Sequence, residues 1–345
     1  MLFNDTDILV KSSNEDLNIF CFIDGIVLKR IKKSLNDRYS IKIIDGIYSF
    51  VDFYADINND DEIYGILNDK SGFLWNIYID EKNSENSILS KELILKYDNE
   101  ISCIKFPYIK YLKKETHIIY YLINKDEPFK CELIHINKED NSVVKNKIDF
   151  SYYNIISNFE VLWEGSIPIL FYFKCINGYE ELFVSKLESK DTWSEPIKIT
   201  NTKKTKIYLS VIKDNAGCFN IVFSEESDGK YHCRYIKGEL KGNTFYQTYT
   251  ETIKTDIMCL FPHLINYKDI SYIQWGEYNY LYTCESNDLG NTWSSSRQCD
   301  KDLESYSKRY LYKSNFIDDK DYILNSVFGH QEYDKMINYK IKDNI

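Results

Sequence analysis

Short apolar stretches recur along the whole chain and are separated by Asn, Asp, Lys and Gly. Between Ile101 and Phe150 the sequence contains four of them in a row, ISCIKFPYIKYL, THIIYYLI, FKCELIHI and SVVKNKIDF. No stretch keeps the 3.6-residue spacing of an amphipathic helix over three turns, and the short lengths and polar breaks are typical of β-strands. The pattern therefore predicts an all-β chain with negligible helix.

The apolar pattern changes with the position of a stretch within its group of four. Second stretches such as HIIYYLI and PILFYF are almost continuously apolar, as expected for a strand that is covered on both faces. A third stretch alternates, with Trp75, Ile77 and Ile79 separated by Asn76 and Tyr78. Four-stranded sheets packed face to face around an axis, as in a β-propeller, account for this change from a buried strand to a wetter one.

The groups of four repeat along the sequence. Seven residues precede the first apolar position of a group: Asp7, Gly46, Glu100, Asn154, Lys206, Asp256 and Arg309. Most of them are about 50 residues apart, a spacing in the range of propeller blades. The segments CIKFPYI and CLFPHL, at Cys103 and Cys259, also resemble each other directly.

We therefore predict a single β-propeller domain over residues 1–345 with seven four-stranded antiparallel blades. The last group supplies only three stretches before the chain ends at Ile345, so we expect Leu2 and Phe3 to add its fourth strand and close the ring. Closure removes exposed sheet edges. A ring of six blades with an irregular first segment is the alternative.

The most specific motif is SNDLGNTW, from Ser286 to Trp293, which matches the Asp-box pattern S-x-D-x-G-x-T-W. Ser286 and Asp288 can hydrogen-bond the backbone of a turn, Gly290 can take a positive φ, and Trp293 can plug the edge of a blade. Two partial copies precede it, DTWS at residues 191–194 and GNTF at residues 242–245. The aromatic residues of the three segments are about 50 residues apart, the same spacing as the groups of four stretches. Each falls between a third and a fourth stretch.

On these motifs the chain resembles the BNR/Asp-box repeat, sialidase-like β-propellers. In that family the Asp boxes are structural and lie on the face opposite the active site. The resemblance therefore implies a structural role for Ser286, Asp288, Gly290 and Trp293.

The resemblance does not carry the family's catalytic residues. Sialidases hold the substrate carboxylate with three arginines, beside a tyrosine nucleophile paired with a glutamate and an aspartate acid/base. This chain has five arginines, of which only Arg309 precedes a first stretch, and the R-I-P motif is absent. Lysine is a poor substitute for bidentate carboxylate binding. We therefore expect a non-catalytic protein, and a glycoside hydrolase or lyase with a rearranged site is the alternative.

First strands of an up-and-down propeller all begin on one face. This placement predicts a ligand site at the axis that includes five residues: Glu100, Lys206, Asp256, His263 and Arg309. Charges of both signs suit a glycan or a peptide better than a phosphate. A protein partner on the axial face and a structural scaffold without a small ligand are the further alternatives.

The charge and composition exclude several classes. The formal net charge of −10 argues against nucleic-acid and anionic-membrane partners, which need a basic surface. The N-terminus has no signal-peptide pattern, and the apolar run from Ile167 to Phe173 is too short to span a bilayer. Nine cysteines, scattered singly, indicate free thiols. We expect a soluble, cytoplasmic protein.

A metal site and a cofactor site are not expected. Asp56, Asn58, Asp60 and Glu62 alternate like the first ligands of a calcium loop, but the loop lacks its sixth-position Gly and its twelfth-position Glu. We interpret this segment as a solvated turn. The sequence contains no Gly-rich phosphate loop and no G-x-S-x-G nucleophile motif.

Overall fold

The structure is a computed structural model of the chain. It describes residues 6–33, 37–79, 89–112, 115–139, 142–256, 258–277, 280–299 and 307–330. The chain divides into two compact units. Unit 1 comprises Met1–Tyr152, Glu188–Trp193 and Leu311–Lys320, and unit 2 comprises Tyr153–Leu187, Ser194–Tyr310 and Asp321–Ile345.

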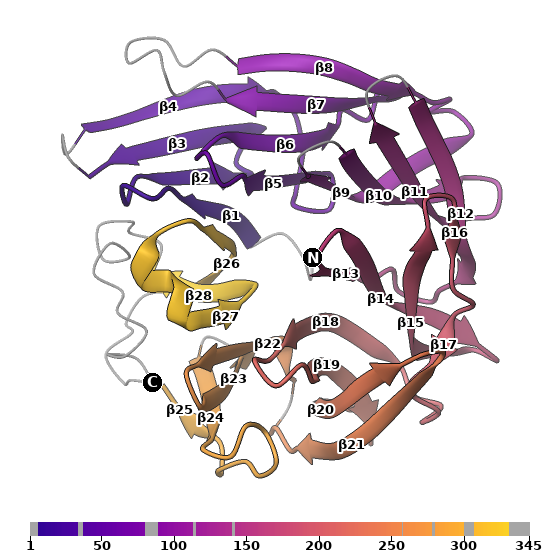
Figure 1. The fold of residues 1–345 in the computed structure, drawn as a ribbon, viewed down its shortest axis with the longest axis vertical. Coiled ribbons are helices and arrows are strands. Elements are labelled where there is room, and N and C mark those ends of the chain that lie inside the picture. Colours follow the sequence, from indigo (N-terminus) through magenta and orange to yellow (C-terminus); the bar gives the residue numbers. More distant parts are fainter. Residues whose placement is uncertain are drawn as a thin grey trace. The chain divides into compact units, whose positions relative to one another are not determined.

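The regular secondary structure of the described residues is almost entirely β-strand, which confirms the prediction of an all-β chain (Figure 1). Among them the only helix is a 3₁₀ segment, η1, over Ile317–Asp321. Strands follow one another in antiparallel pairs because short polar turns return the chain to the neighbouring position in the sheet.

Unit 1 contains most of three sheets. The first has β1 (Thr6–Lys11), β2 (Leu17–Cys21), β3 (Ile26–Lys32) and β4 (Asp37–Ile44). The second has β5 (Phe53–Ile57), β6 (Ile63–Asn68), β7 (Phe73–Ile79) and β8 (Leu89–Lys96). The third has β9 (Ser102–Tyr111), β10 (Glu115–Asn124), β11 (Lys130–Glu139) and β12 (Ser142–Tyr152).

Unit 2 contains most of the other three sheets. In the fourth sheet, β13 (Glu160–Glu164), β14 (Ile167–Ile176) and β15 (Tyr179–Ser189) are followed by the short strands β16 (Thr192–Trp193) and β17 (Ile197–Lys198). The fifth has β18 (Lys206–Lys213), β19 (Phe219–Ser227), β20 (Lys230–Lys241) and β21 (Thr244–Ile253). The sixth has β22 (Leu260–Tyr267), β23 (Ile270–Glu277), β24 (Tyr280–Ser286) and β25 (Arg297–Gln298).

The fold is a β-propeller with six four-stranded blades, so the prediction of seven blades is wrong and the six-bladed alternative is supported. The stretches after Arg309 were counted as a seventh blade. Instead, β26 (Ser307–Ser314) and β28 (Ser326–His330) extend the sheet of β1–β4, and β27 (Tyr322–Leu324) pairs with β22. These strands find backbone partners at the edges of existing sheets, which protects those edges.

Closure by the extreme N-terminus stays a prediction, because Leu2 and Phe3 lie outside the described residues. The strand order β28-β26-β1-β2-β3-β4 places β26 beside β1. Within unit 1, the backbone N–H of Asn315, just after β26, donates to the carbonyl oxygen of Lys11 at 3.0 Å.

The predicted difference between second and third strands is present. All six residues of β6 are buried, whereas buried and half-buried residues alternate along most of β7. Fourth strands such as β12 and β21 are mostly exposed or half-buried. The cores lie between neighbouring sheets, as shown by the ring contacts of Phe20 with Phe53 in unit 1, at 5.1 Å, and of Phe171 with Phe219 in unit 2, also at 5.1 Å.

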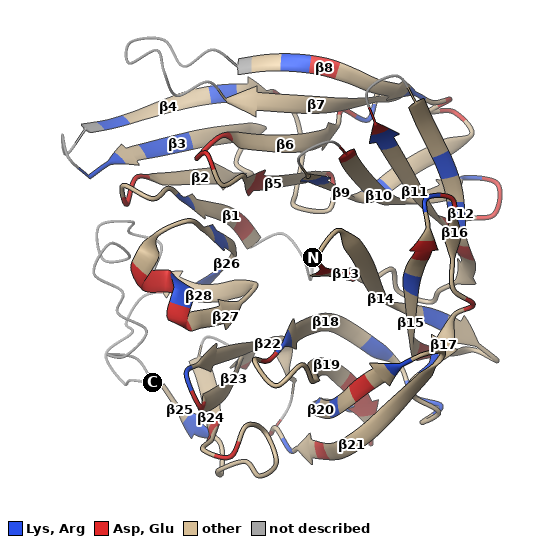
Figure 2. Ribbon diagram, viewed as in Figure 1, with Lys and Arg blue, Asp and Glu red and all other residues tan. Residues whose placement is uncertain are grey.

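Strands of both units carry lysine or arginine residues as well as acidic residues (Figure 2). All nine cysteines are free, six of them buried and three partly buried. No helix in the described part of the chain is long and apolar enough to cross a membrane.

Candidate functional site

Four strands bring a set of polar and aromatic side chains of unit 2 together. Glu160 begins β13, Tyr208 lies on β18, Phe261 and His263 lie on β22, and Arg309 lies on β26. We call these five residues the unit 2 cluster. They come from four separate segments of the sequence, and only the fold makes them neighbours.

Two members of the cluster have a strained backbone. Tyr208 has a φ of 61° and Phe261 a φ of 50°, in the left-handed region that bulky residues rarely adopt. Both lie at β-bulges, where the register shifts between Ile207 and Ser210 and between Leu260 and His263. Such conformations cost roughly 1–3 kcal/mol each and persist where the surroundings over-determine them. The two rings lie 4.2 Å apart between centroids.

The loop before β13 holds the Tyr208 bulge in place. Ser157 Oγ accepts a hydrogen bond from the backbone N–H of Tyr208 at 3.1 Å. The side chain of Asn158 accepts from the N–H of Leu209 at 3.1 Å and donates to its carbonyl oxygen at 2.7 Å. These three bonds satisfy the backbone groups that a bulge removes from the sheet ladder.

Arg309 is the cation of the cluster. Its guanidinium carbon lies 5.1 Å from the centroid of the Phe261 ring, within the range of a cation–π interaction. Burial lowers the pKa of Arg309 to about 10, against the opposing effect of the Glu160 charge. Arg309 therefore stays charged at neutral pH, with Glu160 as an acidic neighbour.

Glu160 is fixed by amide donors on both carboxylate oxygens. Asn158 Nδ2 donates to Oε1 at 3.0 Å, and Asn325 Nδ2 donates to Oε2 at 3.0 Å. Ser210 Oγ in turn donates to Asn325 Oδ1 at 3.2 Å. Because both oxygens are held, the orientation of the carboxylate is set before any ligand arrives.

The two remaining members are uncharged at neutral pH. Burial, with the Arg309 charge as a smaller cause, lowers the pKa of His263 to about 3. Burial raises the pKa of Tyr208 above its ordinary value, although Arg309 opposes this shift. The cluster thus combines a cation, a fixed anion, a neutral imidazole and a neutral phenol. Glu160 is the partly exposed polar group among them, whereas Tyr208, His263 and Arg309 are buried. Its carboxylate can accept hydrogen bonds from a polar ligand.

The structure brings together two of the five residues that the sequence predicted to bind a ligand, His263 and Arg309. Glu100 and Asp256 are exposed in loops before β9 and β22, and their role stays a prediction. Lys206 is fully buried: its Nζ lies 3.3 Å from Glu181 and 3.6 Å from Glu225. The same ammonium donates to the carbonyl oxygens of Glu180, at 2.5 Å, and Lys204, at 2.9 Å. Its hydrogen bonds are made within the protein, so these contacts give no support to a ligand role.

Sequence reasoning missed Glu160, Tyr208, Phe261 and Asn325. One signal was available for Phe261, because the dipeptide Phe-Pro occurs at residues 106–107 and again at residues 261–262. Phe106 has the same positive φ as Phe261, 50°. The resemblance between CIKFPYI and CLFPHL therefore marks a repeated inner-strand bulge.

The turn formed by the SNDLGNTW motif, residues 286–293, lies between β24 and β25. Ser286 Oγ accepts from the N–H of Gly290 and donates to Asp288 Oδ1, both at 2.7 Å. Asp288 accepts from the backbone N–H of Thr292 at 2.8 Å, and hydrogen bonds lower its pKa to about 2. Gly290 has a φ of 85°, and the Trp293 ring packs against Tyr235 with centroids 4.9 Å apart.

The cluster contains one of the five arginines of the chain. The other four arginines lie on third and fourth strands: Arg30 on β3, Arg38 on β4, Arg234 on β20 and Arg297 on β25. In the described part of the chain, no group of three or more His, Cys, Asp or Glu residues could hold a metal ion. In the turn after β5, Asn58 Oδ1 instead accepts the backbone N–H groups of Asp60 and Glu62.

No protein-family profile matches this chain, and no curated protein matches its sequence. Solved structures do match its fold. A family PL25 polysaccharide lyase, an ulvan lyase bound to -[GlcA(1-4)Rha3S]-, has a TM-score of 0.59 and 8% identity over 96% of each chain. Polysaccharide lyase Uly1 has a TM-score of 0.54 and 9% identity, over 89% of this chain and 84% of the lyase.

A third similar structure is the α-L-arabinofuranosidase Arb93A from Fusarium graminearum in complex with an iminosugar inhibitor. Its TM-score is 0.50 and its identity 10%, over 95% of this chain and 98% of the enzyme. At this level of identity the similarity concerns the fold alone.

Proposed function

We propose that the protein is a carbohydrate-binding β-propeller of the sialidase-like type and that the unit 2 cluster contacts the glycan. The observation that carries the proposal is the cation–π contact of Arg309 with the Phe261 ring, which also packs against Tyr208. The Glu160 carboxylate in the same cluster accepts hydrogen bonds from Asn158 and Asn325, which fix its orientation. Glycan sites combine aromatic surface with a few oriented polar groups. Strain at Tyr208 and Phe261 is typical of backbone that a functional site has over-determined.

Within this proposal the members of the cluster have different tasks. Glu160 and Phe261, together with the adjacent Asn325, are partly exposed and supply the atoms that contact sugar hydroxyl groups and ring faces. Tyr208, His263 and Arg309 are buried and hold those atoms in place. The proposal of a carbohydrate as the ligand is supported by two of the similar structures, a polysaccharide lyase bound to its saccharide and an arabinofuranosidase bound to an iminosugar.

We favour binding without catalysis because the cluster contains one arginine, Arg309, and the acidic group beside it is the protein's own Glu160 rather than a substrate carboxylate. A sialidase-type site needs three arginines that are available to the substrate carboxylate. The Asp-box turn supports the sialidase-like assignment through the hydrogen bonds of Ser286 and Asp288, and its role there is structural.

A polysaccharide lyase or glycoside hydrolase is the second candidate. One observation favours it: the partly exposed Glu160 carboxylate lies beside the Arg309 cation, and a carboxylate can act as a general base. A protein-binding propeller and a scaffold without a ligand are the remaining alternatives.

The test is glycan binding by the purified protein, measured on an array and then by titration calorimetry. Phe261→Ala and Asn325→Ala should each weaken binding by about tenfold, the typical loss at a contact that dominates affinity. Arg297→Ala is the matched control, because Arg297 lies on exposed β25 and pairs with Glu285 at 3.4 Å. Circular dichroism of each variant checks the fold.

Three results would contradict the proposal. Unchanged affinity in both site variants would remove the cluster from the binding site. Release of unsaturated uronate or of reducing ends by the wild type would establish the enzyme instead. Failure of the wild type to bind any glycan would leave the protein-binding and scaffold alternatives.

A further inference from the structure

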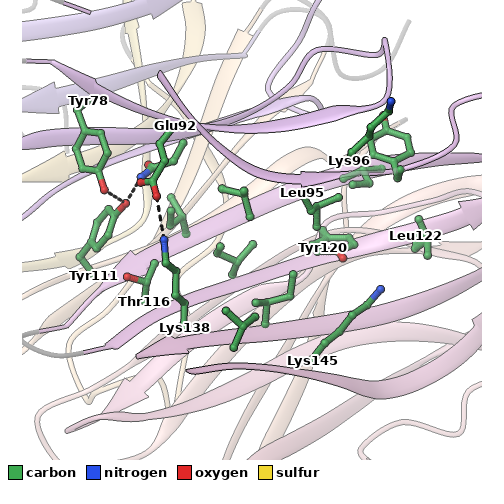
Figure 3. Close-up of a pocket in the computed structure, with 18 residues that line it drawn as sticks. Tyr78, Glu92, Leu95, Lys96, Tyr111, Thr116, Tyr120, Leu122, Lys138 and Lys145 are labelled. Atoms are coloured by element: carbon green, nitrogen blue, oxygen red, sulfur yellow. Dashed lines mark hydrogen bonds and ion pairs between the residues drawn. The ribbon is translucent and has the colours of Figure 1, made fainter. Parts of the chain in front are cut away.

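Unit 1 contains a pocket of about 430 Å³ between the sheet of β5–β8 and the sheet of β9–β12 (Figure 3). The volume lies in the range of about 300–1,000 Å³ that is typical of small-molecule sites. All of its lining residues belong to unit 1, so the pocket is separate from the unit 2 cluster.

Much of the pocket wall is aliphatic, although Tyr97, Thr116 and Tyr120 also line it. Six of the lining side chains are Ile94, Leu95, Ile109, Ile118, Leu122 and Ile136. Ile94, Leu95 and Leu122 are only half-buried, although they pack against the buried cluster around Ile118. A sugar would leave its hydroxyl groups without partners along such a wall, whereas an alkyl chain would gain burial of apolar surface.

One end of the pocket carries polar groups that are paired with each other. Glu92 accepts from Lys138 Nζ at 2.9 Å, and this bond lowers the pKa of Glu92. The hydroxyl of Tyr111 hydrogen-bonds the hydroxyl of Tyr78 and the side-chain amide of Asn76. Because these groups satisfy one another, this end has little capacity left for an ionic ligand.

The opposite end carries two lysines, Lys96 from β8 and Lys145 from β12 (Figure 3). Within the described residues, neither ammonium has a carboxylate at ion-pair distance, unlike the lysines of neighbouring positions such as Lys138 and Lys147. Lys96 Nζ lies 5.6 Å from the centroid of the Phe73 ring. This end is therefore cationic, next to an aliphatic slot.

We propose that this pocket binds a long-chain aliphatic carboxylate, with its alkyl chain along the Ile and Leu wall and its carboxylate at Lys96 and Lys145. Charge complementarity selects an acid over a neutral alcohol of the same length, because ammonium-to-carboxylate hydrogen bonds are charge-assisted. The aliphatic wall selects a chain over a compact anion. This ligand site is independent of the glycan proposal.

Titration calorimetry with saturated fatty acids from octanoate to myristate, each below its aggregation concentration, tests the proposal. The dissociation constant of the wild type should fall by about fourfold for each added methylene until the slot is full. An alcohol of equal length should bind about tenfold more weakly than the acid.

The double variant Lys96→Ala/Lys145→Ala should lose the preference for the acid and keep the affinity for the alcohol. The control Lys91→Ala/Lys147→Ala removes the same two charges from the same two strands, at positions outside the lining. It should bind like the wild type. Leu95→Trp should fill the slot and weaken the acid and the alcohol alike.

Several results would overturn the proposal: no binding of any chain, no dependence on chain length, equal affinity for acid and alcohol, or equal losses in the two double variants. A variant that unfolds is identified by circular dichroism. In that case the chain-length series and the acid–alcohol comparison on the wild type still decide the question.

Discussion

His135 Nδ1 accepts a hydrogen bond from the indole Nε1–H of Trp193 at 3.1 Å. His135 Nε2 lies 3.0 Å from His117 Nδ1, and His117 Nε2 lies 3.1 Å from Glu115 Oε2. Since the indole can only donate, neutral His135 must carry its proton on Nε2 and donate to His117, which in turn donates to Glu115. The chain is complete only while both imidazoles are neutral.

Unit 2 has the same arrangement with other residue types. Trp293 packs against Tyr235, whose hydroxyl donates to Asn220 Oδ1 at 2.5 Å, and Asn220 Nδ2 donates to Asp214 at 3.0 Å. At these two hairpins between a third and a fourth strand, the tryptophan thus packs onto a polar chain that ends at a carboxylate. This repeat is visible only in three dimensions, because His and Tyr, or His and Asn, have no sequence similarity.

The histidine chain predicts a loss of stability in mild acid. Burial lowers the pKa of His135 to about 3 and also lowers that of His117, whereas an unfolded histidine titrates near its ordinary value. Below about pH 6.5 these histidines are therefore protonated in the unfolded state but not in the folded state. Each of them can lower the free energy of unfolding by up to about 1.4 kcal/mol per pH unit. Urea denaturation between pH 7 and pH 4.5 measures this slope.

His135→Gln is the matched variant for that measurement, since glutamine does not titrate. It should flatten the pH dependence relative to the wild type. An equally steep dependence in His135→Gln would assign the acid sensitivity to other groups, of which His263 is one, because its pKa is also lowered to about 3.

Gly290→Ala should destabilise the Asp-box turn by well over the ~1 kcal/mol expected for a positive φ alone. A Cβ at this position would lie 2.1 Å from the Tyr235 hydroxyl oxygen, as well as in a φ of 85°. Gly242→Ala separates the two causes, because Gly242 has a φ of 56° and no atom within 4 Å of its added Cβ. Thermal melting gives the stability of both variants, and an equal decrease in melting temperature would show that the Tyr235 contact does not contribute.

Lys206→Met should cost about 3–5 kcal/mol, the range for removing one partner of a buried ion pair. Methionine keeps the length of the side chain but leaves the buried carboxylates of Glu181 and Glu225 without their cation. Lys204→Met is the control and should change the free energy of unfolding little, because Lys204 Nζ donates to the Ser227 hydroxyl, at 3.0 Å, and is not buried. Guanidinium denaturation gives both values, and similar values would indicate that Lys206 is not paired.

Asn158→Ala should weaken glycan binding as well as stability. The variant removes the bonds to Leu209 and the donor to Glu160, so the Tyr208 bulge and the carboxylate lose their support together. We expect a stability loss of about 1–3 kcal/mol. Asn201→Ala, which loses only a bond from exposed Lys198, is the control. Full glycan affinity in a destabilised Asn158→Ala would separate the bulge from the binding site.

The strand pattern and the Asp-box hairpin could be predicted from the sequence because both depend on local information. Alternation of side chains along β7 and the fixed offsets of Ser286 and Asp288 are properties of single strands and turns. The blade count could not be predicted in this way. The segments that became β26 and β27 have ordinary strand patterns, and their pairing with β1 and β22 joins segments that are far apart in the sequence.

The candidate site was predicted only in part, for a related reason. Arg309 and Lys206 look equivalent in the sequence, since each precedes a first apolar stretch. Burial and partners distinguish them: Lys206 is enclosed by Glu181 and Glu225, whereas Arg309 lies over Phe261 beside Glu160. Glu160 and Asn325 lie far apart in the sequence and are neighbours only in the fold, and a single sequence does not indicate which distant residues come into contact.

The distribution of the nine thiols makes each unit report its own opening. Cys21 and Cys131 are buried in unit 1, and Cys233, Cys259, Cys284 and Cys299 are buried in unit 2. A thiol reagent can reach these sulfur atoms only when the surrounding sheet opens, so labelling at high reagent concentration follows the opening rate and labelling at low concentration follows its equilibrium. Mass spectrometry of the labelled peptides would therefore show whether the thiols of the two units are labelled at the same rate, which indicates opening together, or at different rates. No engineered probe is needed.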